Sequence, residues 1–215
     1  MARSQHPEII LASGSSARAQ VLARAALPFT QRVSDIDEPA LVASQNRELT
    51  PVEIPELLAQ AKGRAVATEV AQEITSPTLI LAADSVFEFN SSVYGKPHEP
   101  EIAIERWRAQ QGQSGTLHTG HWLGLLHPEK PGALKQQVVT DSAEVEFAAV
   151  DEQTILDYVA TGEPLGCAGG FTLEARGASL IQSVQGDPNT VLGLSLRVVR
   201  ESLQTWGYRL SDWWD

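Results

Sequence analysis

A turn of small residues near the N-terminus carries groups suited to holding a phosphate. Ser13-Gly14-Ser15-Ser16 stands between a short apolar run and a run of helix formers, so its backbone N–H groups and the first turn of the helix would form a site for an anion. Arg18 lies one turn into that helix and adds a cation that could face the same anion. The alternative is a plain helix cap, because such turns begin helices in many proteins.

Asp84 is the clearest candidate for a catalytic group. It follows Thr78-Leu79-Ile80-Leu81-Ala82-Ala83, an apolar run of the kind found in strands that are buried on both faces. We therefore expect a strand over residues 78–84 that ends at this carboxylate, which is where α/β sheets bind their ligands. The alternative is an aspartate that only starts a turn.

A lysine and an acidic cluster could complete a phosphate site. In Gly95-Lys96-Pro97 the glycine permits close approach of the backbone, the proline stiffens the turn and the lysine presents one positive charge. Asp35, Asp37 and Glu38 offer the oxygen ligands that a hard divalent cation needs. The alternatives are an exposed lysine at the exit of a hairpin and a solvated acidic loop.

The other metal-ligating and nucleophilic residue types favour structural roles. His118 and His121 are three residues apart in a predicted strand, so their side chains would point to opposite faces and would not form a metal pair. The only cysteine is Cys167, which excludes an intramolecular disulfide and a thiolate metal cluster. We expect it to be an inert packed thiol, and we expect Trp107 and Trp122 to lie in the core.

Helical and strand-like segments are interspersed along the whole chain, which predicts an α/β protein with a mixed twisted sheet and flanking helices. No internal repeat or linker divides the sequence, so we expect a single domain over residues 1–215, with two lobes. The predicted segments are strands at 8–12, 29–33, 78–84, 118–126, 137–147 and 180–184, a hairpin over 86–94, a surface loop over 35–55, and helices at 18–26, 56–73, 100–111, 151–160 and 189–206.

Composition and charge exclude several classes of protein. The 215 residues are 42% hydrophobic, which is enough to bury a core. With 16 Lys and Arg against 27 Asp and Glu, the formal charge is −11, so a broad nucleic-acid surface or an anionic membrane is a poor partner. No apolar run approaches the roughly 20 residues that span a bilayer, and the polar N-terminus does not resemble a signal peptide. Together with the single cysteine, these features predict a cytoplasmic protein.

In this order and spacing, several short motifs resemble the Maf family of nucleotide pyrophosphatases, also called septum-formation-inhibitor-like proteins, along nearly the whole chain. The combination of Arg106-Trp107, Ser114-Gly115 and His118-Thr119-Gly120-His121 is most similar to the actinobacterial branch. The matching segments are Leu11-Ala12-Ser13-Gly14-Ser15-Ser16-Ala17-Arg18, Ala83-Asp84-Ser85, Gly95-Lys96-Pro97, Ser114-Gly115-Thr116-Leu117-His118-Thr119-Gly120, Tyr158-Val159-Ala160-Thr161-Gly162-Glu163-Pro164, Ala168-Gly169-Gly170-Phe171 and Gly186-Asp187-Pro188-Asn189-Thr190-Val191-Leu192-Gly193-Leu194.

The resemblance implies an elongated α/β fold related to the inosine triphosphate pyrophosphatases, with a deep cleft between two lobes, and a homodimer. It implies hydrolysis of a nucleoside triphosphate to the monophosphate and pyrophosphate, dependent on Mg²⁺ or Mn²⁺. Asp84 matches the catalytic aspartate, which is taken as the proton acceptor and as a possible metal ligand, and Asp37 matches an acidic position near the metal. The positions that match the phosphate end of the substrate site are Ser13, Ser15, Arg18, Lys62 and Lys96.

Four departures from the family pattern leave the substrate open. Ala17 replaces one of two arginines, and Ser85 replaces the usual threonine. Cys167 and Glu174 stand where lysine and glutamine are common, in the region associated with base choice. A preference for dTTP or UTP is therefore not carried over, and a 7-methyl-GTP preference, or one for another modified nucleotide, is an alternative.

Two other classes of function remain as alternatives. One is a nucleotide-binding regulator of cell division that does not turn over its ligand, which the missing arginine at Ala17 favours. The other is an interaction protein that uses the tryptophan-rich C-terminus, where Trp206, Trp213 and Trp214 would dock on the body of the protein or on a partner chain.

Overall fold

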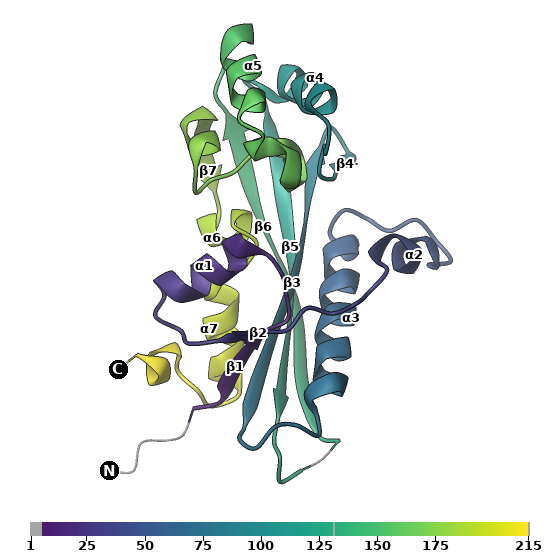
Figure 1. Ribbon diagram of the computed structural model, residues 1–215, viewed down its shortest axis with the longest axis vertical. Helices are drawn as coiled ribbons and strands as arrows, with labels where there is room; N and C mark the ends of the chain where they lie inside the picture. The colour runs from purple at the N-terminus through teal and green to yellow at the C-terminus, as the bar shows by residue number, and fades with distance from the viewer. Residues whose placement is uncertain (1–5, 131, 215) are drawn as a thin grey trace.

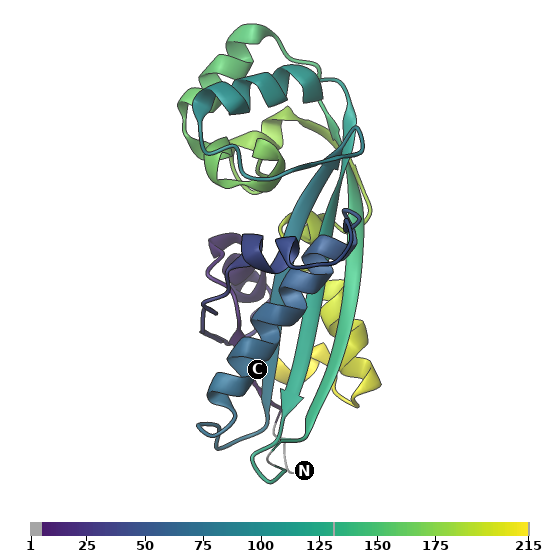
Figure 2. The same ribbon diagram turned by 90° about the vertical axis from the view of Figure 1, so that its right-hand side faces the viewer.

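The computed structural model describes residues 6–130 and 132–214, which form a seven-stranded mixed sheet with helices on both faces (Figures 1 and 2). The strand order is β2-β1-β3-β5-β6-β7, and β4 also pairs with β3. The strands are β1 (Glu8–Leu11), β2 (Thr30–Gln31), β3 (Thr78–Phe89), β4 (Ser92–Tyr94), β5 (Ser114–Leu126), β6 (Leu134–Phe147) and β7 (Ile181–Gln185).

The helices cover the sheet in separate groups. In Figure 1, α1 and α7 lie on one side of β3 and α3 on the other, while α4 and α5 gather at the far end of the long strands. The α-helices are α1 (Ser16–Arg24), α2 (Glu38–Ala43), α3 (Glu53–Val70), α4 (Pro100–Gln110), α5 (Glu152–Ala160), α6 (Pro188–Val191) and α7 (Leu196–Thr205). Short 3₁₀ helices cover Glu163–Gly166, Ala168–Gly170, Arg176–Leu180 and Leu210–Trp213.

Apolar side chains form three clusters that follow this arrangement. One packs β1, α1 and α7 against β3, and a second packs α3 against β3 and the fully buried Trp122. The third lies at the other end of the strands, where Phe87, Trp107, Phe147 and Phe171 meet edge to face. The long strands β3, β5 and β6 connect the two ends, and Asp84 lies between the clusters along β3.

The close packing of α3 explains why a glycine stands inside a helix. A Cβ added at Gly63 would lie 2.1 Å from Cε3 of Trp122, a side chain that is fully buried. Glycine has a lower helix propensity than every residue except proline, but only a residue without a Cβ lets the backbone of α3 come this close to the sheet. This approach brings Lys62, the preceding residue, close to β3.

The structure confirms the predicted mixed sheet with flanking helices and most of the predicted elements. The predicted core positions Trp107 and Trp122 are fully buried. The prediction that a strand ends at Asp84 is wrong, because β3 continues without a break from Thr78 to Phe89 and includes the first arm of the predicted hairpin. A polar residue in an apolar strand indicates an end only when it lacks a partner inside the fold, and this carboxylate has one.

Two other predictions are also corrected. The predicted surface loop over 35–55 contains α2, which begins after Asp37, since its carboxylate accepts a hydrogen bond from the N–H of Ala40 and Pro39 occupies the first turn. The predicted helix over 189–206 is two helices, α6 and α7. They are separated at Gly193, whose φ of +88° is incompatible with a continuous right-handed helix.

The C-terminal tryptophans dock on the body of the protein. Trp213 is 3% exposed, and its indole N–H donates to the carbonyl of Pro7 at 2.9 Å. Trp214 is more than half exposed and donates to the carbonyl of Ala25 at 2.9 Å. Among the described residues, no helix is long and apolar enough to cross a membrane.

Candidate active site

The site is built at an interruption in one edge of β3. One edge of this strand pairs with β5 from Thr78 to Glu88. On the other edge, β1 pairs with residues 78–81 and β4 pairs with residues 87–89. No strand in the described chain pairs with this edge over residues 82–86, and Asp84 lies at the centre of that interval. The turn after β1 lies beside the middle of the long strands (Figure 1), and β4 ends opposite Phe87, at the limit of this interval.

A lysine joins two carboxylates at this point. Nζ of Lys62, on α3, lies 2.6 Å from Oδ1 of Asp84 and 2.8 Å from Oε1 of Glu38. Asp84 is only 8% exposed. Burial raises the pKa of Asp84 above its ordinary value, and the positive charges of Lys62 and Arg18 oppose that rise. The result is a carboxylate that is more basic than one in water and that has a cation in contact with it.

Arg18 reaches the same region from α1. Its Nε donates to the carbonyl of Gly193 at 2.8 Å, Nη1 donates to Oγ of Ser13 at 2.9 Å and Nη2 donates to Oγ of Ser85 at 3.2 Å. A guanidinium has five N–H groups, so two remain without an acceptor among the described residues. Burial lowers the pKa of Arg18 while Asp84 raises it, and an arginine stays charged in proteins. The side chain is therefore a fixed cation with two donors left for an anion.

The small residues before α1 form the turn that the sequence predicts. Oγ of Ser15 caps the helix by accepting the N–H of Arg18, and Oγ of Ser13 accepts the N–H of Ser15 at 3.3 Å. Ser13 is buried at 6% exposure. The turn therefore caps the helix, which is the plain alternative, and it also holds Arg18. Phosphate binding at this turn stays a prediction.

Lys96 lies after β4 and is exposed. The carbonyl of the preceding Gly95 accepts a hydrogen bond from Nη1 of Arg106 at 2.5 Å, and the Arg106 guanidinium lies 5.0 Å from the centre of the Tyr94 ring. In the described chain, no hydrogen bond or ion pair joins Lys96 to Asp84, Arg18 or Lys62. Its place at the phosphate end of the site remains a prediction.

The acidic cluster is divided by the cap of α2. Asp37 is exposed, and its carboxylate accepts a hydrogen bond from the N–H of Ala40 at 2.9 Å. Its neighbour Glu38 instead faces Lys62 and, through it, Asp84. Sequence reasoning placed Glu38 in the cluster but not in the site. The signal that could have separated the two is the helix start itself, because an aspartate before a Pro-containing first turn is typical of an N-cap.

The oxygen donors at the site fit a hard cation that is shared with a phosphate. Asp84 and Glu38 supply two carboxylates, both in contact with Lys62. The hydroxyls of Ser13 and Ser85 accept hydrogen bonds from Arg18 in the same region. Residues 6–130 and 132–214 contain no group of three or more His, Cys, Asp or Glu side chains that could hold a metal ion. Mg²⁺ is commonly held by one or two carboxylates together with substrate phosphates, so the residues fit that mode and not an all-protein cage.

The two histidines have structural partners on opposite faces of β5. His118 lies 2.7 Å from Oγ of Ser142 and 3.0 Å from Oε2 of Glu88. Burial lowers the pKa of His121 to about 4, and its Nε2 accepts the N–H of Ser195 at 2.8 Å. The neutral ring therefore carries its proton on Nδ1, which faces the carbonyl of Val139 at 3.2 Å.

Cys167 lies in the region associated with base choice and is close enough to Lys96 for that charge to act on its thiol. Cys167 is half-buried, and burial together with Glu174 and Glu163 raises the pKa of its thiol, while Lys96 opposes the rise. A raised pKa keeps the thiol protonated at neutral pH, which agrees with the prediction of an inert residue.

Two hollows in the structure lie away from Asp84. Each has a volume of about 460 Å³. One is lined by the C-terminal segment around Tyr208 and Trp214, and the other by the connection between α2 and α3 together with Ser91, Ser92 and Val93. Neither includes a predicted site residue, so the deep cleft at Asp84 remains a prediction.

Comparison with known proteins connects this geometry to a family. A nucleoside triphosphate pyrophosphatase of a Synechocystis strain is 41% identical over 208 residues, which are 97% of this chain and 99% of the relative. A nucleoside triphosphate pyrophosphatase of Leifsonia xyli is 40% identical over 212 residues, 96% of each chain. These relatives confirm the resemblance seen in the sequence and extend it to cyanobacterial as well as actinobacterial members.

A solved structure gives only a distant likeness. The nucleoside-triphosphatase / dITP/XTP pyrophosphatase of Mycobacterium abscessus is 8% identical, with a TM-score of 0.38 over 93% of this chain and 94% of that one. A score this low supports no argument about this protein. The family model described as Maf-like protein matches residues 8–206. The chain therefore belongs to the Maf family.

Proposed function

We propose that this protein hydrolyses a nucleoside triphosphate to the nucleoside monophosphate and pyrophosphate. The observation that carries the proposal is the convergence of Asp84, Lys62, Glu38 and Arg18 on the unpaired edge of β3. A buried base beside fixed cations is what attack of water on a phosphate anhydride needs. The relatives that align over nearly the whole chain carry the name of this activity.

The cations and the N-terminal turn bind the triphosphate. Arg18 offers the two N–H groups that have no acceptor within residues 6–130 and 132–214, and its orientation is set by three acceptors. The N–H groups at the start of α1 add partial positive charge. Lys62 and Lys96 supply further charge, with Lys96 approaching from the segment after β4. These groups are aimed before the reaction begins, so they stabilise the charge that grows on the leaving pyrophosphate without reorganisation.

Asp84 acts as the general base. It accepts a proton from the water that attacks the α-phosphorus, the new P–O bond forms, and the P–O bond to the bridging oxygen between the α- and β-phosphates breaks. Burial raises the pKa of Asp84, which strengthens it as a base, while Lys62 keeps it ionised. A divalent cation, Mg²⁺ or Mn²⁺, would be held by Asp84 and Glu38 together with the phosphates and would neutralise part of their charge. In this proposal Asp37 stays outside the cation site, on the cap of α2.

Replacing Asp84 by Asn tests the proposal, because the amide keeps the shape of the carboxylate and removes the base. We expect kcat for pyrophosphate release to fall by about 100-fold or more, with the far-ultraviolet circular dichroism of the wild type. Asp157→Asn is the matched control, since Asp157 is an exposed carboxylate on α5, and it should leave kcat unchanged. Near-wild-type turnover by a folded Asp84→Asn protein would overturn the assignment.

The identity of the base belongs to the same proposal. Cys167 and Glu174 differ from the family pattern in the region associated with base choice, so both a dTTP/UTP-type and a 7-methyl-GTP-type substrate are candidates, consistent with removal of non-standard or excess nucleotides. Turnover of dTTP, UTP, 5-methyl-UTP and 7-methyl-GTP, each with Mg²⁺ and with Mn²⁺, would separate them. Loss of turnover on chelation would support the metal requirement.

The second candidate is a nucleotide-binding regulator of cell division without turnover. Ala17 favours it, because one of the family's two arginines is missing from the phosphate site. Multiple turnovers per protein molecule would exclude it. We further propose a cytoplasmic homodimer built from one two-lobed domain. The single cysteine fits a reducing compartment, and sedimentation equilibrium would test the dimer.

A further inference from the structure

Three groups accept hydrogen bonds from Arg18, and one of them is the hydroxyl of Ser85. The direction of the Ser85 proton depends on the other groups that this hydroxyl contacts. The carbonyl of Gly193 can only accept, and Oγ of Ser13 already accepts the N–H of Ser15. Oγ of Ser85 lies 3.2 Å from Nη2 of Arg18 and 2.9 Å from Oγ1 of Thr119. A serine hydroxyl rotates freely and has one proton, whereas a guanidinium can only donate. The group that accepts the proton of Ser85 therefore decides where the lone pairs of Ser85 point.

Counting protons fixes the direction of this chain. Oγ1 of Thr119 lies 2.7 Å from the carbonyl oxygen of Thr190, which can only accept, so the single proton of Thr119 is donated there. Thr119 must then accept from Ser85, and the Ser85 proton points away from Arg18. The lone pairs of Ser85 consequently face Nη2. The hydrogen bonds run in one direction from Arg18 through Ser85 and Thr119 to Thr190.

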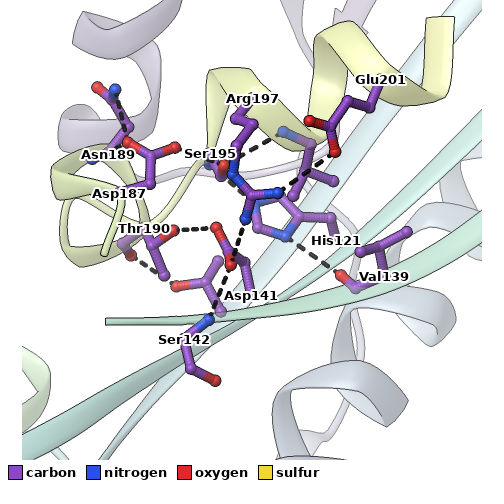
Figure 3. Close-up of polar contacts among 12 residues, drawn as sticks. His121, Val139, Asp141, Ser142, Asp187, Asn189, Thr190, Ser195, Arg197 and Glu201 are labelled. Carbon is purple, nitrogen blue, oxygen red and sulfur yellow. Dashed lines mark hydrogen bonds and ion pairs between the residues drawn. The ribbon is translucent and has the colours of Figure 1, made fainter. Parts of the chain in front are cut away.

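The far end of the chain is held rigidly. Oγ1 of Thr190 donates to Oδ2 of Asp141 at 2.6 Å (Figure 3). The other oxygen of Asp141 accepts hydrogen bonds from Nη2 of Arg197 at 2.6 Å and from the N–H of Ser142 at 3.1 Å. Thr190 is fully buried. Its carbonyl is therefore a fixed end point for the proton of Thr119.

Residues 187–195, which include Thr190, form a closed segment that also contacts Arg18 directly. Oγ of Ser195 donates to Oδ2 of Asp187 at 2.6 Å, which joins the two ends of residues 187–195 (Figure 3). Between them, Gly193 presents its carbonyl to Nε of Arg18. A Cβ at Gly193 would lie 3.1 Å from this nitrogen and 3.3 Å from Oγ of Ser85. The segment thus sets two of the three contacts of Arg18, one directly and one through Thr119.

We propose that Thr119 is a positioning residue for the reaction, which keeps Ser85 an acceptor and so holds the Arg18 guanidinium in the orientation that receives the triphosphate. The inference rests on the proposed function. Thr119 itself is fully buried, so in this proposal it acts through Ser85 and not on the substrate. Without its oxygen, the proton of Ser85 loses the acceptor that fixes it, so the lone pairs of Ser85 are no longer held toward Nη2 of Arg18.

The test compares Thr119→Val and Thr119→Ser in the wild-type protein and in a Ser85→Ala background. Steady-state kinetics gives kcat and KM for the best triphosphate substrate, and calorimetry gives the affinity for inorganic pyrophosphate. We expect Thr119→Val to lower kcat/KM by about tenfold, equivalent to roughly 1.4 kcal/mol, mostly through KM, and to weaken pyrophosphate binding to a similar extent. Thr119→Ser should restore both values.

The Ser85→Ala background separates positioning from general damage. If Thr119 acts through Ser85, adding Thr119→Val to Ser85→Ala should change kcat/KM by less than about twofold. Thr78→Val is the matched control, since Thr78 is a buried threonine in β3 whose hydroxyl also bonds a carbonyl, far along the strand from Asp84. It should lower the melting temperature without changing kcat/KM.

Two results would overturn the inference: a folded Thr119→Val protein with unchanged kcat/KM and pyrophosphate affinity, or an equal loss in both backgrounds. Thr119→Ala replaces the valine variant if that variant does not fold. A wild-type protein without pyrophosphatase turnover would contradict the proposed function alone, and the pyrophosphate affinities of the same variants would then decide the inference.

Discussion

In the proposed mechanism Asp84 is the base, and two of the groups that act on its pKa are neighbours of opposite charge. Lys62 lies between Asp84 and Glu38, with its nitrogen 2.6 Å and 2.8 Å from their oxygens. Burial raises the pKa of Asp84, Lys62 and Arg18 lower it, and Glu38 raises it to a smaller extent. Substitutions at the two neighbours should therefore move the same titration in opposite directions.

Lys62→Met and Glu38→Gln test this arrangement through the acid limb of the pH profile of kcat/KM. Asp84 must be ionised to accept a proton, so activity is lost as the pH falls through its pKa. Removing the Lys62 cation raises that pKa and should move the limb to higher pH, with kcat/KM at the optimum reduced roughly tenfold by the lost charged contact. Removing the Glu38 charge should move the limb to lower pH. Shifts in the same direction for both variants would contradict the assignment of the limb to Asp84.

The sequence predicts those site residues that a local pattern marks, and it does not predict contacts between segments that are distant in the chain. The Ser13 turn, Arg18 and Asp84 can be identified from local pattern, because small residues before a helix and a carboxylate in an apolar strand are visible in the sequence. The role of Lys62 followed only from the resemblance, since nothing in an amphipathic helix marks one lysine. The separation of Glu38 from Asp37, and the contacts of Gly193 and Thr119, depend on packing between distant segments that no local pattern records.

At the scale of elements, β3 and the segment between β7 and α7 differ most from the sequence prediction. Asp84 was expected to end a strand because a charge inside a buried strand is costly. Its ion pair with Lys62 offsets that cost, and β3 continues. The predicted helix over 189–206 is divided because Gly193 turns its carbonyl toward Arg18. Both differences from the sequence prediction lie at the site. The contacts of Asp84 and Gly193 within the site therefore account for where β3 and the last helices end.

His121 links β5 to α7 and gives stability a pH dependence. Its pKa is about 4 in the folded protein and near 6.5 in an unfolded chain, so the unfolded chain binds more protons between these values. The free energy of unfolding should fall as the pH drops from 7 to 5, and His121 should contribute roughly 2 kcal/mol of that fall. Urea unfolding of wild type and His121→Gln at both pH values measures the difference. A decrease of the same size in both proteins would show that His121 is not its source.

On the scale of the whole molecule, three clusters of buried apolar side chains are arranged along the long strands, and the site lies at the interruption between β1 and β4. The C-terminal tail closes one end of this arrangement, because Trp213 packs against Tyr208 and His6 and donates to Pro7. The tail thus belongs to the core of the described structure, which argues against a free, tryptophan-rich interaction arm.

Trp213→Ala and Trp214→Ala should separate these two roles of the tail. Trp213 is 3% exposed, so its loss should lower the free energy of unfolding by about 3–5 kcal/mol. Trp214 is 55% exposed, and its loss should cost about 1 kcal/mol. Denaturant unfolding gives both values, and sedimentation equilibrium gives the oligomeric state. A stable Trp213→Ala protein with an altered oligomeric state would favour the interaction arm instead.

In the proposed reaction, water attacks the α-phosphorus at the edge of β3 that holds Asp84. Hydrolysis in ¹⁸O-labelled water, followed by mass spectrometry of the products of a single turnover, tests it directly. Attack at the α-phosphorus puts one ¹⁸O atom in the nucleoside monophosphate and none in the pyrophosphate. Label in the pyrophosphate, or release of inorganic phosphate that carries the label, would contradict it.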